Sequence, residues 1–322
     1  MISLVIPAFN EEEGLEELYR RITTAAKGWN EDYELILVDD GSFDRTLEIC
    51  ERLAAQDTHF KVISLSRNFG HQVAVSAGLE HAAGRIIAVI DADLQDPPEE
   101  LVSFFEKLAE GYDVVYAIRT RRKEGVWKRF SYYLYYRILR RLATLDIPLD
   151  AGDFCVMRAD VVAAINQLPE RNRFVRGLRS WVGFRQVGLA YERDARYAGE
   201  VKYTLPRLVK LALDGVFNFS YRPLRLIAAC GIAVGVFSVF LGIFILIQYL
   251  TDWTVAGFNP RQAQGWTSLI MVLLFSSAVQ LFCLGIVGEY VGRLFEEVKQ
   301  RPVYLTKRTI NLDRPGAVKT AP

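Results

Sequence analysis

The chain has 322 residues and a nearly balanced charge, with 39 Lys and Arg against 38 Asp and Glu. A formal charge of +1 gives no overall positive field for gripping a polyanion, so we expect no nucleic-acid partner. Hydrophobic residues make up 51% and charged residues 24%, which excludes a disordered, collagen-like or coiled-coil chain and fits one large or two smaller domains.

Up to residue 120, short apolar runs alternate with segments of helical spacing. The predicted strands are 2–6, 34–38, 61–65, 86–90 and 113–118. The predicted helices lie near 11–27, 44–56, 70–83 and 97–110. Continuous Val, Ile and Leu runs are typical of strands covered on both faces, and their alternation with helices indicates a mostly parallel, doubly wound α/β sheet. Ligands of such a sheet bind beyond the carboxyl ends of its strands.

Polar residues follow three of these strands, as PAFNEE at 7–12, DDGS at 39–42 and DADLQDPPE at 91–99. The first turn has no glycine, so neither a dinucleotide-binding turn nor a P-loop is present. Asn10 and the two prolines of the third segment also suit helix starts. Helix capping does not account for the paired acids of that segment, which therefore need another explanation.

Asp91, Asp93 and Gln95 stand at alternate positions after the fourth strand. In an extended segment residues i and i+2 point the same way, so these side chains can converge. Two close carboxylates repel each other unless a cation lies between them, and hard oxygen ligands suit Mg²⁺ or Mn²⁺. The sequence therefore predicts a metal site made of these three residues.

Aromatic and basic residues are mixed in two later segments. Residues 126–145 interleave Trp, Phe and Tyr with Lys and Arg, and residues 204–225 repeat the pattern. Such mixing is typical of a helix that lies at a membrane surface, although an aromatic stripe can also belong to a protein core. We expect an interfacial helix at 126–145 and a juxtamembrane amphipathic helix at 204–225.

Two segments carry no charged residue, 226–250 with 25 residues and 266–288 with 23. As helices they would be about 37 and 34 Å long, enough to cross a hydrocarbon core of about 30 Å. The alternative is a pair of buried core helices, which rarely stay uncharged all round at this length. Residues 226–288 are thus predicted to form a transmembrane hairpin.

Basic residues lie on both outer flanks of the hairpin, whereas the loop 251–265 has one basic residue. By the positive-inside rule both flanks are cytoplasmic. The first residues, MISLVIP, lack a basic n-region and do not resemble a signal peptide. We therefore expect a multi-pass membrane protein with residues 1–203, both termini and the tail 289–322 inside, and with 309–322 disordered.

The motifs SLVIPAFNEEE, ILVDDGSFD, LSRNFGHQVAVSAGL, VIDADLQDPPE and RYAGEVKY resemble those of the inverting, GT-A-fold glycosyltransferases of family 2. The match spans about residues 1–220. DADLQDPPE and two C-terminal spans are similar to the polyprenyl-phosphate glycosyltransferases, especially the bactoprenol glucosyltransferases and, more distantly, dolichol-phosphate mannose synthase. The resemblance implies a GT-A catalytic domain at residues 1–203 of a protein in the bacterial plasma membrane.

The resemblance also implies roles for individual residues. Those around the nucleotide would be Pro7, Phe9, Glu11, Asp40 and Arg67. Those holding Mg²⁺ or Mn²⁺ on the diphosphate would be Asp91, Asp93 and Gln95. Those contacting the acceptor phosphate would be Arg119, Arg129, Arg196 and Lys202. The catalytic set would be Asp91, Asp93, Arg119 and Asp153. Related sequences often have Ser where this one has Val201, so a hydroxyl contact is lost there.

A lipid monophosphate has a second pKa near 6 and is mostly dianionic at neutral pH, so it needs no strong general base. Asp153 is accordingly expected to orient the acceptor or the sugar, with Asp150 as the competing carboxylate. His71 is expected to form a local hydrogen bond and not to act as a base.

The preferred prediction is transfer of a single hexose, glucose from UDP-glucose, to a polyprenyl phosphate of the undecaprenyl type at the inner membrane face. One alternative is transfer from GDP-mannose, as in dolichol-phosphate mannose synthase. Another is a processive polysaccharide synthase, but the Q-x-x-R-W element of those enzymes is absent, and residues 176–181 match it only in part. The last is a non-catalytic, membrane-anchored sugar-nucleotide binder. The predicted partners are a UDP-hexose, the lipid phosphate and the bilayer, and a homo-oligomer is left open.

Overall fold

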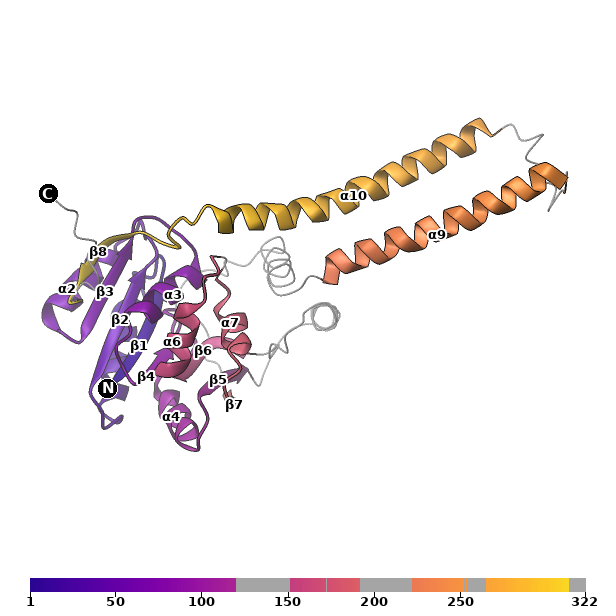
Figure 1. Cartoon of the computed structure of the whole chain (residues 1–322). Coiled ribbons are helices and arrows are strands. Elements are labelled where there is room, and N and C mark those ends of the chain that lie inside the picture. The colour runs from indigo at the N-terminus through magenta and orange to yellow at the C-terminus, as the bar shows by residue number, and fades with distance from the viewer. Residues whose placement is uncertain (120–150, 172, 192–221, 252, 254–264, 313–322) are drawn as a thin grey trace, which may run out of the picture. The chain divides into compact units, whose positions relative to one another are not determined.

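The computed structural model of the chain describes residues 1–119, 151–171, 173–191, 222–251, 253 and 265–312 (Figure 1). The chain divides into two compact units. One comprises Met1–Gly215 together with Arg301–Pro322, and the other comprises Val216–Gln300. The predicted interfacial helix at 126–145 and most of the predicted helix at 204–225 lie outside the described residues.

The first unit contains a sheet of eight strands among its described residues, in the order β7-β5-β6-β4-β1-β2-β3-β8. The strands are β1 (Ile2–Ala8), β2 (Tyr33–Asp39), β3 (Phe60–Leu65), β4 (Ile86–Val89), β5 (Val114–Arg119), β6 (Ala151–Arg158), β7 (Gln186–Tyr191) and β8 (Thr306–Ile310). The four strands β3, β2, β1 and β4 are parallel, and β5 is parallel to β7. Strand β6 is antiparallel to both β4 and β5, and β8 is antiparallel to β3. The prediction of a mostly parallel sheet is confirmed, and all five predicted strands form.

Helices lie on both faces of this sheet (Figure 1). They are α1 (Leu15–Ala26), α2 (Thr46–Gln56), α3 (His71–His81), α4 (Leu101–Ala109), α6 (Ala159–Gln167) and α7 (Val175–Trp181), with the 3-10 turn η1 (Pro98–Glu100) before α4. Successive residues of β2 serve two cores, because Leu35 and Leu37 pack in one buried cluster and Ile36 and Val38 in the other. This alternation explains the continuous apolar run of β2, since both of its faces are covered.

Strand β8 corrects the prediction of a disordered tail at 309–322 for residues 309–312, and residues 313–322 lie outside the described residues. Thr309 and Ile310 pair with β3, and Asn311 donates hydrogen bonds from Nδ2 to the carbonyl oxygens of Ala54 (2.7 Å) and Phe60 (3.0 Å). The sequence of β8, TKRTI, lacks the apolar run by which the other strands were identified. An edge strand can be polar because one side of its ladder faces solvent.

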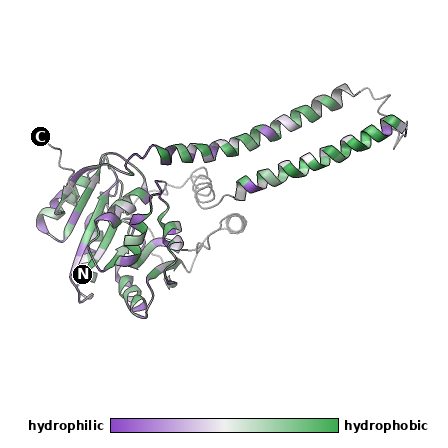
Figure 2. Ribbon diagram, in the orientation of Figure 1, coloured by the Kyte–Doolittle hydropathy of each residue, from purple (hydrophilic) through white to green (hydrophobic). Residues whose placement is uncertain are grey.

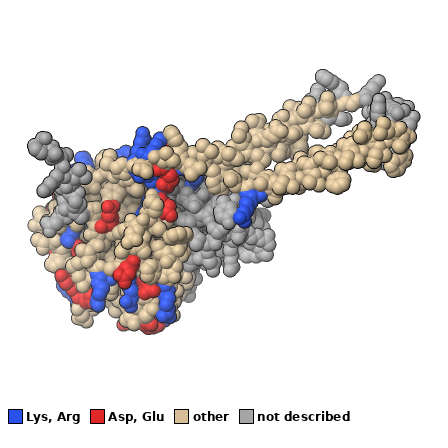
Figure 3. Space-filling view, viewed as in Figure 1, with Lys and Arg blue, Asp and Glu red and all other residues tan. Residues whose placement is uncertain are grey.

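The second unit holds two long helices, α9 (Arg222–Thr251) and α10 (Trp266–Val298), each longer than its uncharged run. Their apolar stretches, Ile227–Gln248 and Val272–Val298, have mean hydropathies of 2.7 and 1.8 and are long enough to cross a membrane. Figure 2 shows both helices as mainly hydrophobic, and Figure 3 shows few charged side chains on them. Large side chains such as Phe240 and Phe275 are 66% and 72% exposed, so these are not core helices.

Candidate active site

The turns after β1 and β2 are locked together by hydrogen bonds. The backbone N–H of Asn10 donates to Ser42 Oγ (3.0 Å), and the N–H of Phe43 donates to Asn10 Oδ1 (3.1 Å). The N–H of Ser42 donates in turn to Asp39 Oδ1 (3.0 Å). The rings of Phe9 and Phe43 meet edge to face at 5.7 Å between centroids. Both turns therefore have a fixed geometry at the carboxyl edge of the sheet.

Asp40 fixes the loop that leads into α3. Its Oδ1 accepts from the N–H of Phe69 (2.7 Å) and its Oδ2 from the N–H of Gly70 (2.9 Å). Burial raises the pKa of Asp40, although these two N–H groups oppose the shift. Gly41 adopts φ +68° and lies so close to this loop that a Cβ there would be 2.5 Å from the carbonyl carbon of Arg67. Asp40 thus has a structural role, and its contact with a nucleotide stays a prediction.

The acidic segment after β4 is a turn and not an extended strand end. Burial nevertheless alternates along it, with Ala92, Leu94 and Asp96 buried and the three predicted metal ligands between them partly exposed. Leu94 has φ +58°, in the left-handed region that costs a non-glycine residue about 1–2 kcal/mol. The N–H of Gln95 donates to Asp93 Oδ1 (3.2 Å). The segment is therefore a turn with left-handed backbone at Leu94, and the convergence of Asp91, Asp93 and Gln95 on one side stays a prediction.

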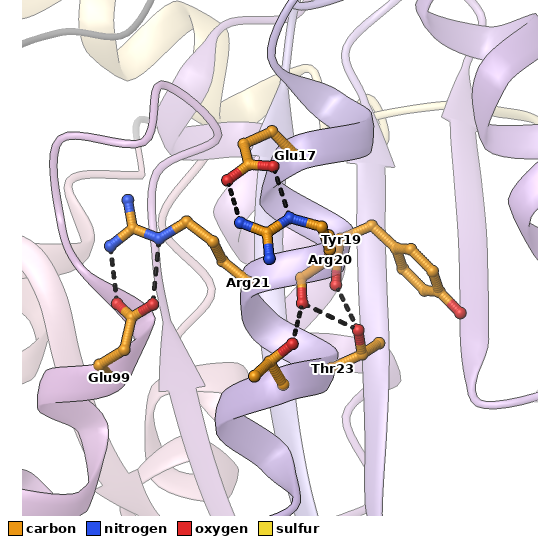
Figure 4. Close-up of polar contacts among 7 residues, drawn as sticks. Glu17, Tyr19, Arg20, Arg21, Thr23 and Glu99 are labelled. Carbon is orange, nitrogen blue, oxygen red and sulfur yellow. Dashed lines mark hydrogen bonds and ion pairs between the residues drawn. The ribbon is translucent and has the colours of Figure 1, made fainter.

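Two contacts hold the far end of this turn. The hydroxyl of Tyr191, the last residue of β7, donates to the buried Asp96. Arg21 of α1 donates from Nε and Nη2 to the two carboxylate oxygens of Glu99 at 3.0 and 2.7 Å (Figure 4). The acidic turn is therefore tied to an edge strand on one side of the sheet and to α1.

Asp153 of β6 lies beside Asp91 in a cluster drawn from distant parts of the chain. Arg176 of α7 donates from Nε and Nη2 to the two oxygens of Asp153, both at 2.7 Å. His71 Nε2 lies 3.1 Å from Asp153 Oδ2 and 3.6 Å from Asp91 Oδ1. Gln72 Nε2 donates to Asp153 Oδ2 at 3.3 Å. The first turn of α3 thus brings His71 and Gln72 to Asp153, near the start of β6, and His71 also to Asp91, which follows the neighbouring β4.

These contacts set the charges of the cluster. Burial would raise the pKa of Asp153, but the charge and hydrogen bonds of Arg176, with those of His71, hold it well below its usual range. Burial would lower the pKa of His71, yet the hydrogen bond and charge of Asp153, together with Asp91, raise it to about 9. At neutral pH Asp153 is therefore anionic and His71 cationic.

Asp91 carries the electrostatic signature of a cation site. Burial and the charges of Asp153, Asp96 and Asp93 raise the pKa of Asp91 to about 6, although His71 opposes the shift. Ligand atoms of His71, Asp91 and Asp153 lie within 4.8 Å of one another. A divalent cation would relieve the repulsion between these acids, and their oxygens suit Mg²⁺ or Mn²⁺. The carboxylates present therefore fit a bound metal ion, whereas the protonated His71 does not act as a ligand. Asp91 is common to this cluster and to the predicted ligand set of Asp91, Asp93 and Gln95.

The remaining predicted residues are placed only in part. Pro7 is buried in β1, the N–H of Glu11 donates to Thr46 Oγ1 (2.9 Å), and the exposed Arg67 lies over the ring of Phe69. Arg119 ends β5, but its side chain is outside the description. Also outside the described residues are Arg129, Asp150, Arg196 and Lys202. The acceptor-phosphate contacts accordingly stay predictions.

Sequence reasoning missed Arg176 as a site residue and understated His71. The hydrogen bond expected of His71 exists, but it is not local, because its partner Asp153 is 82 residues away. Arg176 was weighed only as part of an incomplete Q-x-x-R-W element. The signal in the sequence was the mixture of Arg176 and Arg179 with Val175, Leu178 and Trp181 in one short helix, VRGLRSW. A charged residue in such a turn needs a partner.

Comparison with known proteins identifies the family of the chain. The profile of Glycosyl transferase family 2 matches residues 3–165. The chain belongs to this family. It is 43% identical to the uncharacterized glycosyltransferase YkcC of Bacillus subtilis, over 97% of this chain and 94% of that protein. It is 39% identical to the SfII prophage-derived bactoprenol glucosyl transferase of Shigella flexneri, over 96% and 98%. It is 37% identical to the prophage bactoprenol glucosyl transferase homolog of Escherichia coli, over 95% and 98%.

The family 2 membership confirms the resemblance drawn from the motifs, and it makes this chain a glycosyltransferase. The relatives match nearly end to end, so the similarity includes α9 and α10 as well as the sheet. The non-catalytic alternative loses its ground because the family and the relatives named bactoprenol glucosyl transferase indicate a glycosyltransferase.

Proposed function

We propose that this glycosyltransferase moves a single glucose from UDP-glucose to a polyprenyl phosphate at the inner face of the bacterial plasma membrane, with inversion at the anomeric carbon. A phosphate oxygen of the lipid forms a bond to the anomeric carbon, and the bond from that carbon to the diphosphate of UDP breaks. The similarity to bactoprenol glucosyl transferases over nearly the whole chain supports the donor sugar and the lipid acceptor.

The state of Asp153 is the observation that carries the choice of a phosphate acceptor. A sugar hydroxyl must lose a proton as it attacks, so it needs a base. Asp153 is held by both nitrogens of Arg176 and has a lowered pKa, and the neighbouring His71 is already protonated. Neither group is suited to take a proton at neutral pH. A phosphate acceptor arrives as an anion and needs none.

Asp153 then has a positioning task. Its charge is matched by Arg176 and His71, so the cluster presents cationic N–H groups beside a fixed carboxylate. Mg²⁺ or Mn²⁺ held by Asp91, Asp93 and Gln95 would neutralise the diphosphate of the donor as it leaves. Arg119, Arg129, Arg196 and Lys202 remain the residues proposed to contact the acceptor phosphate.

The two apolar helices support a lipid as the acceptor. α9 and α10 are long and apolar enough to span a bilayer, and their large side chains are exposed in their own unit. A transferase anchored in this way works where a polyprenyl phosphate is confined. The basic flanks of the hairpin favour the inner face.

The test is incubation of the purified full chain in nanodiscs with polyprenyl phosphate, Mn²⁺ and a panel of UDP-glucose, UDP-galactose, UDP-GlcNAc and GDP-mannose. Mass spectrometry of the lipid should show one hexose added from UDP-glucose. Asp93→Asn should abolish this product, whereas the exposed Asp160→Asn should retain it. A ladder of sugars would establish a processive synthase instead, and an unchanged lipid with every donor would refute the proposal.

A further inference from the structure

We propose that Phe43 is the face on which the base of the donor nucleotide stacks. This inference rests on the proposed function and adds a contact that gives affinity for the nucleotide to the same site. Phe43 is 83% exposed, more than any other large apolar side chain among the described residues, including those of α9 and α10. Single exposed apolar residues are common on protein surfaces, so exposure by itself assigns nothing to Phe43.

The backbone that carries Phe43 is held rigidly. Its N–H donates to Asn10 Oδ1 (3.1 Å), and the N–H of Asn10 donates back across the two turns to Ser42 Oγ (3.0 Å). Asn10 has φ +54° and Gly41 has φ +68°, so both turns use left-handed backbone to reach this geometry. Such conformations persist only where surrounding contacts impose them, and they gather at binding sites. The turn therefore presents a fixed aromatic ring to solvent.

The order of the strands places this ring at the right distance from the acidic turn. Strands β4, β1 and β2 are neighbours in that order, and the acidic turn, Phe9 and Phe43 follow them respectively. Adjacent strands are about 4.8 Å apart, so Phe43 follows a strand roughly 10 Å along the edge from the one before the acidic turn. A nucleoside diphosphate covers a comparable length between its terminal phosphate and its base.

On the other side of the acidic turn, the carboxyl edge of the sheet is occupied by the Asp153 cluster. Strand β6, on the other side of β4, supplies Asp153, which is held by Arg176 and His71. A diphosphate at the acidic turn therefore has its nucleoside toward β1 and β2 and its sugar toward the Asp153 cluster. This direction leads the base past Phe9 to Phe43.

The ring of Phe43 is chemically suited to a base. Phe9 meets Phe43 edge to face with an interplanar angle of 81°, and the 83% exposure leaves most of the Phe43 ring uncovered. An aromatic ring stacks on any base through its face, and loss of such a stack by alanine substitution weakens binding by roughly ten- to a hundredfold. Stacking gives affinity for a base with little choice between bases.

The experiment measures binding of UDP, GDP and ribose 5-diphosphate to the full chain in nanodiscs with Mn²⁺, by calorimetry. Ribose 5-diphosphate has the sugar and phosphates of the nucleotide but no base. We expect Phe43→Ala to raise the Kd of the preferred nucleoside diphosphate at least tenfold and to leave that of ribose 5-diphosphate within twofold. Phe43→Trp should bind the nucleotide as wild type does or more tightly. Val102→Ala, which removes an exposed apolar side chain from α4, is the matched control and should change neither Kd.

Each other outcome overturns the inference. A nucleotide Kd that stays within twofold in Phe43→Ala means that no base stacks there. An equal loss for nucleotide and ribose 5-diphosphate means that Phe43 only shapes the turn. If the wild type binds neither UDP nor GDP, the proposed function fails as well. Failure of the stacking inference alone leaves nucleotide binding by the wild type intact, so the two failures can be told apart.

Discussion

Asp153 is a buried carboxylate whose charge is matched by Arg176 and His71. Arg176→Ala should destabilise the protein by about 1.5–3 kcal/mol, because Asp153 loses two charge-assisted hydrogen bonds and keeps His71 and Gln72 as partners. The double variant Arg176→Ala/Asp153→Asn should recover part of that loss, since it removes the stranded charge. Thermal unfolding of wild type, both single variants and the double variant measures the coupling. A double variant less stable than Arg176→Ala would contradict the pairing.

Gly41 is the residue on which close approach of two loops depends. Gly41→Ala places a Cβ 2.5 Å from the carbonyl carbon of Arg67 and 2.8 Å from the backbone nitrogen of Asn68, and neither backbone atom can move away cheaply. We expect the loops to separate and UDP affinity to fall at least tenfold. Gly28→Ala is the control, because its Cβ would meet only Ala25 O at 3.4 Å. Equal UDP affinity in both variants, measured by calorimetry, would show that this approach does not shape the donor site.

Glu34 gives the sheet a pH-dependent contribution to stability. It is 2% exposed and accepts hydrogen bonds from Ser3 Oγ, Lys61 Nζ (2.6 Å) and the N–H of Ala83 (2.8 Å). Burial would raise the pKa of Glu34, but these donors outweigh it and lower the pKa. A carboxyl with a lowered folded-state pKa stabilises the fold above its unfolded pKa of about 4.3, and this contribution is lost as the pH falls through the folded-state value.

Glu34→Gln should therefore lower the unfolding midpoint at pH 7, by the equivalent of about 1–3 kcal/mol, and flatten its fall below pH 5. Thermal unfolding from pH 7 to pH 3 tests this, with the exposed Glu110→Gln as control. Parallel curves for wild type and Glu34→Gln would show that Glu34 has the same pKa in both states.

Some features of the site can be predicted from the sequence, and others appear only in the folded chain. The alternation of burial along Asp91, Asp93 and Gln95 is local to one segment after one strand, whereas their joint binding of a metal ion stays a prediction. The conformation of their turn was not predictable, since the sequence Asp-Leu-Gln does not require a left-handed backbone at Leu94. The Asp153 cluster depends on contacts 23 and 82 residues apart, so only the folded chain shows that Arg176 and His71 share one carboxylate.

At the scale of elements, the same distinction holds between strands with long apolar runs and strands without them. The strands β1 to β5 were predictable because apolar runs covered on both faces are visible in sequence. β6 and β7 were not predicted because their apolar runs are short, FCVM in β6 and LAY in β7, and follow Gly, Asp or Gln residues. β8 is the extreme case, since its five residues are partly or fully exposed and its position depends on pairing with β3.

Asn311 is the anchor of β8, and its replacement tests the strand. Its amide donates to three carbonyl oxygens at the end of α2 and the start of β3, those of Ala54, Asp57 and Phe60. Asn311→Ala leaves these acceptors without that donor, at about 1–3 kcal/mol, so amides of β8 and β3 should exchange roughly 5- to 100-fold faster. Arg308→Ala breaks only an exposed pair with Glu51, worth about 0–1 kcal/mol, and should change exchange less than fivefold. Equal effects in a hydrogen-exchange experiment would contradict the anchoring role.

At the scale of the whole molecule, the chain leaves the sheet, forms α9 and α10, and returns to the sheet as β8. Seven residues, 299–305, connect α10 to β8. Both ends of the apolar hairpin therefore join the same unit, and one folded unit cannot lie on both sides of a bilayer. If α9 and α10 span the membrane, the sheet and both flanks are on one side and residues 251–265 on the other.

Labelling with a membrane-impermeant maleimide in intact cells tests this topology. The native cysteines give little background, because Cys50 and Cys155 are buried and Cys230 and Cys283 lie within apolar helices. Gly265→Cys, just before α10, should be labelled from outside, whereas Ser103→Cys on the exposed side of α4 should be labelled only after the cells are opened. Labelling of Ser103→Cys in intact cells would place the active site outside, away from cytoplasmic UDP-glucose. Labelling of neither variant in intact cells would mean that α9 and α10 do not span.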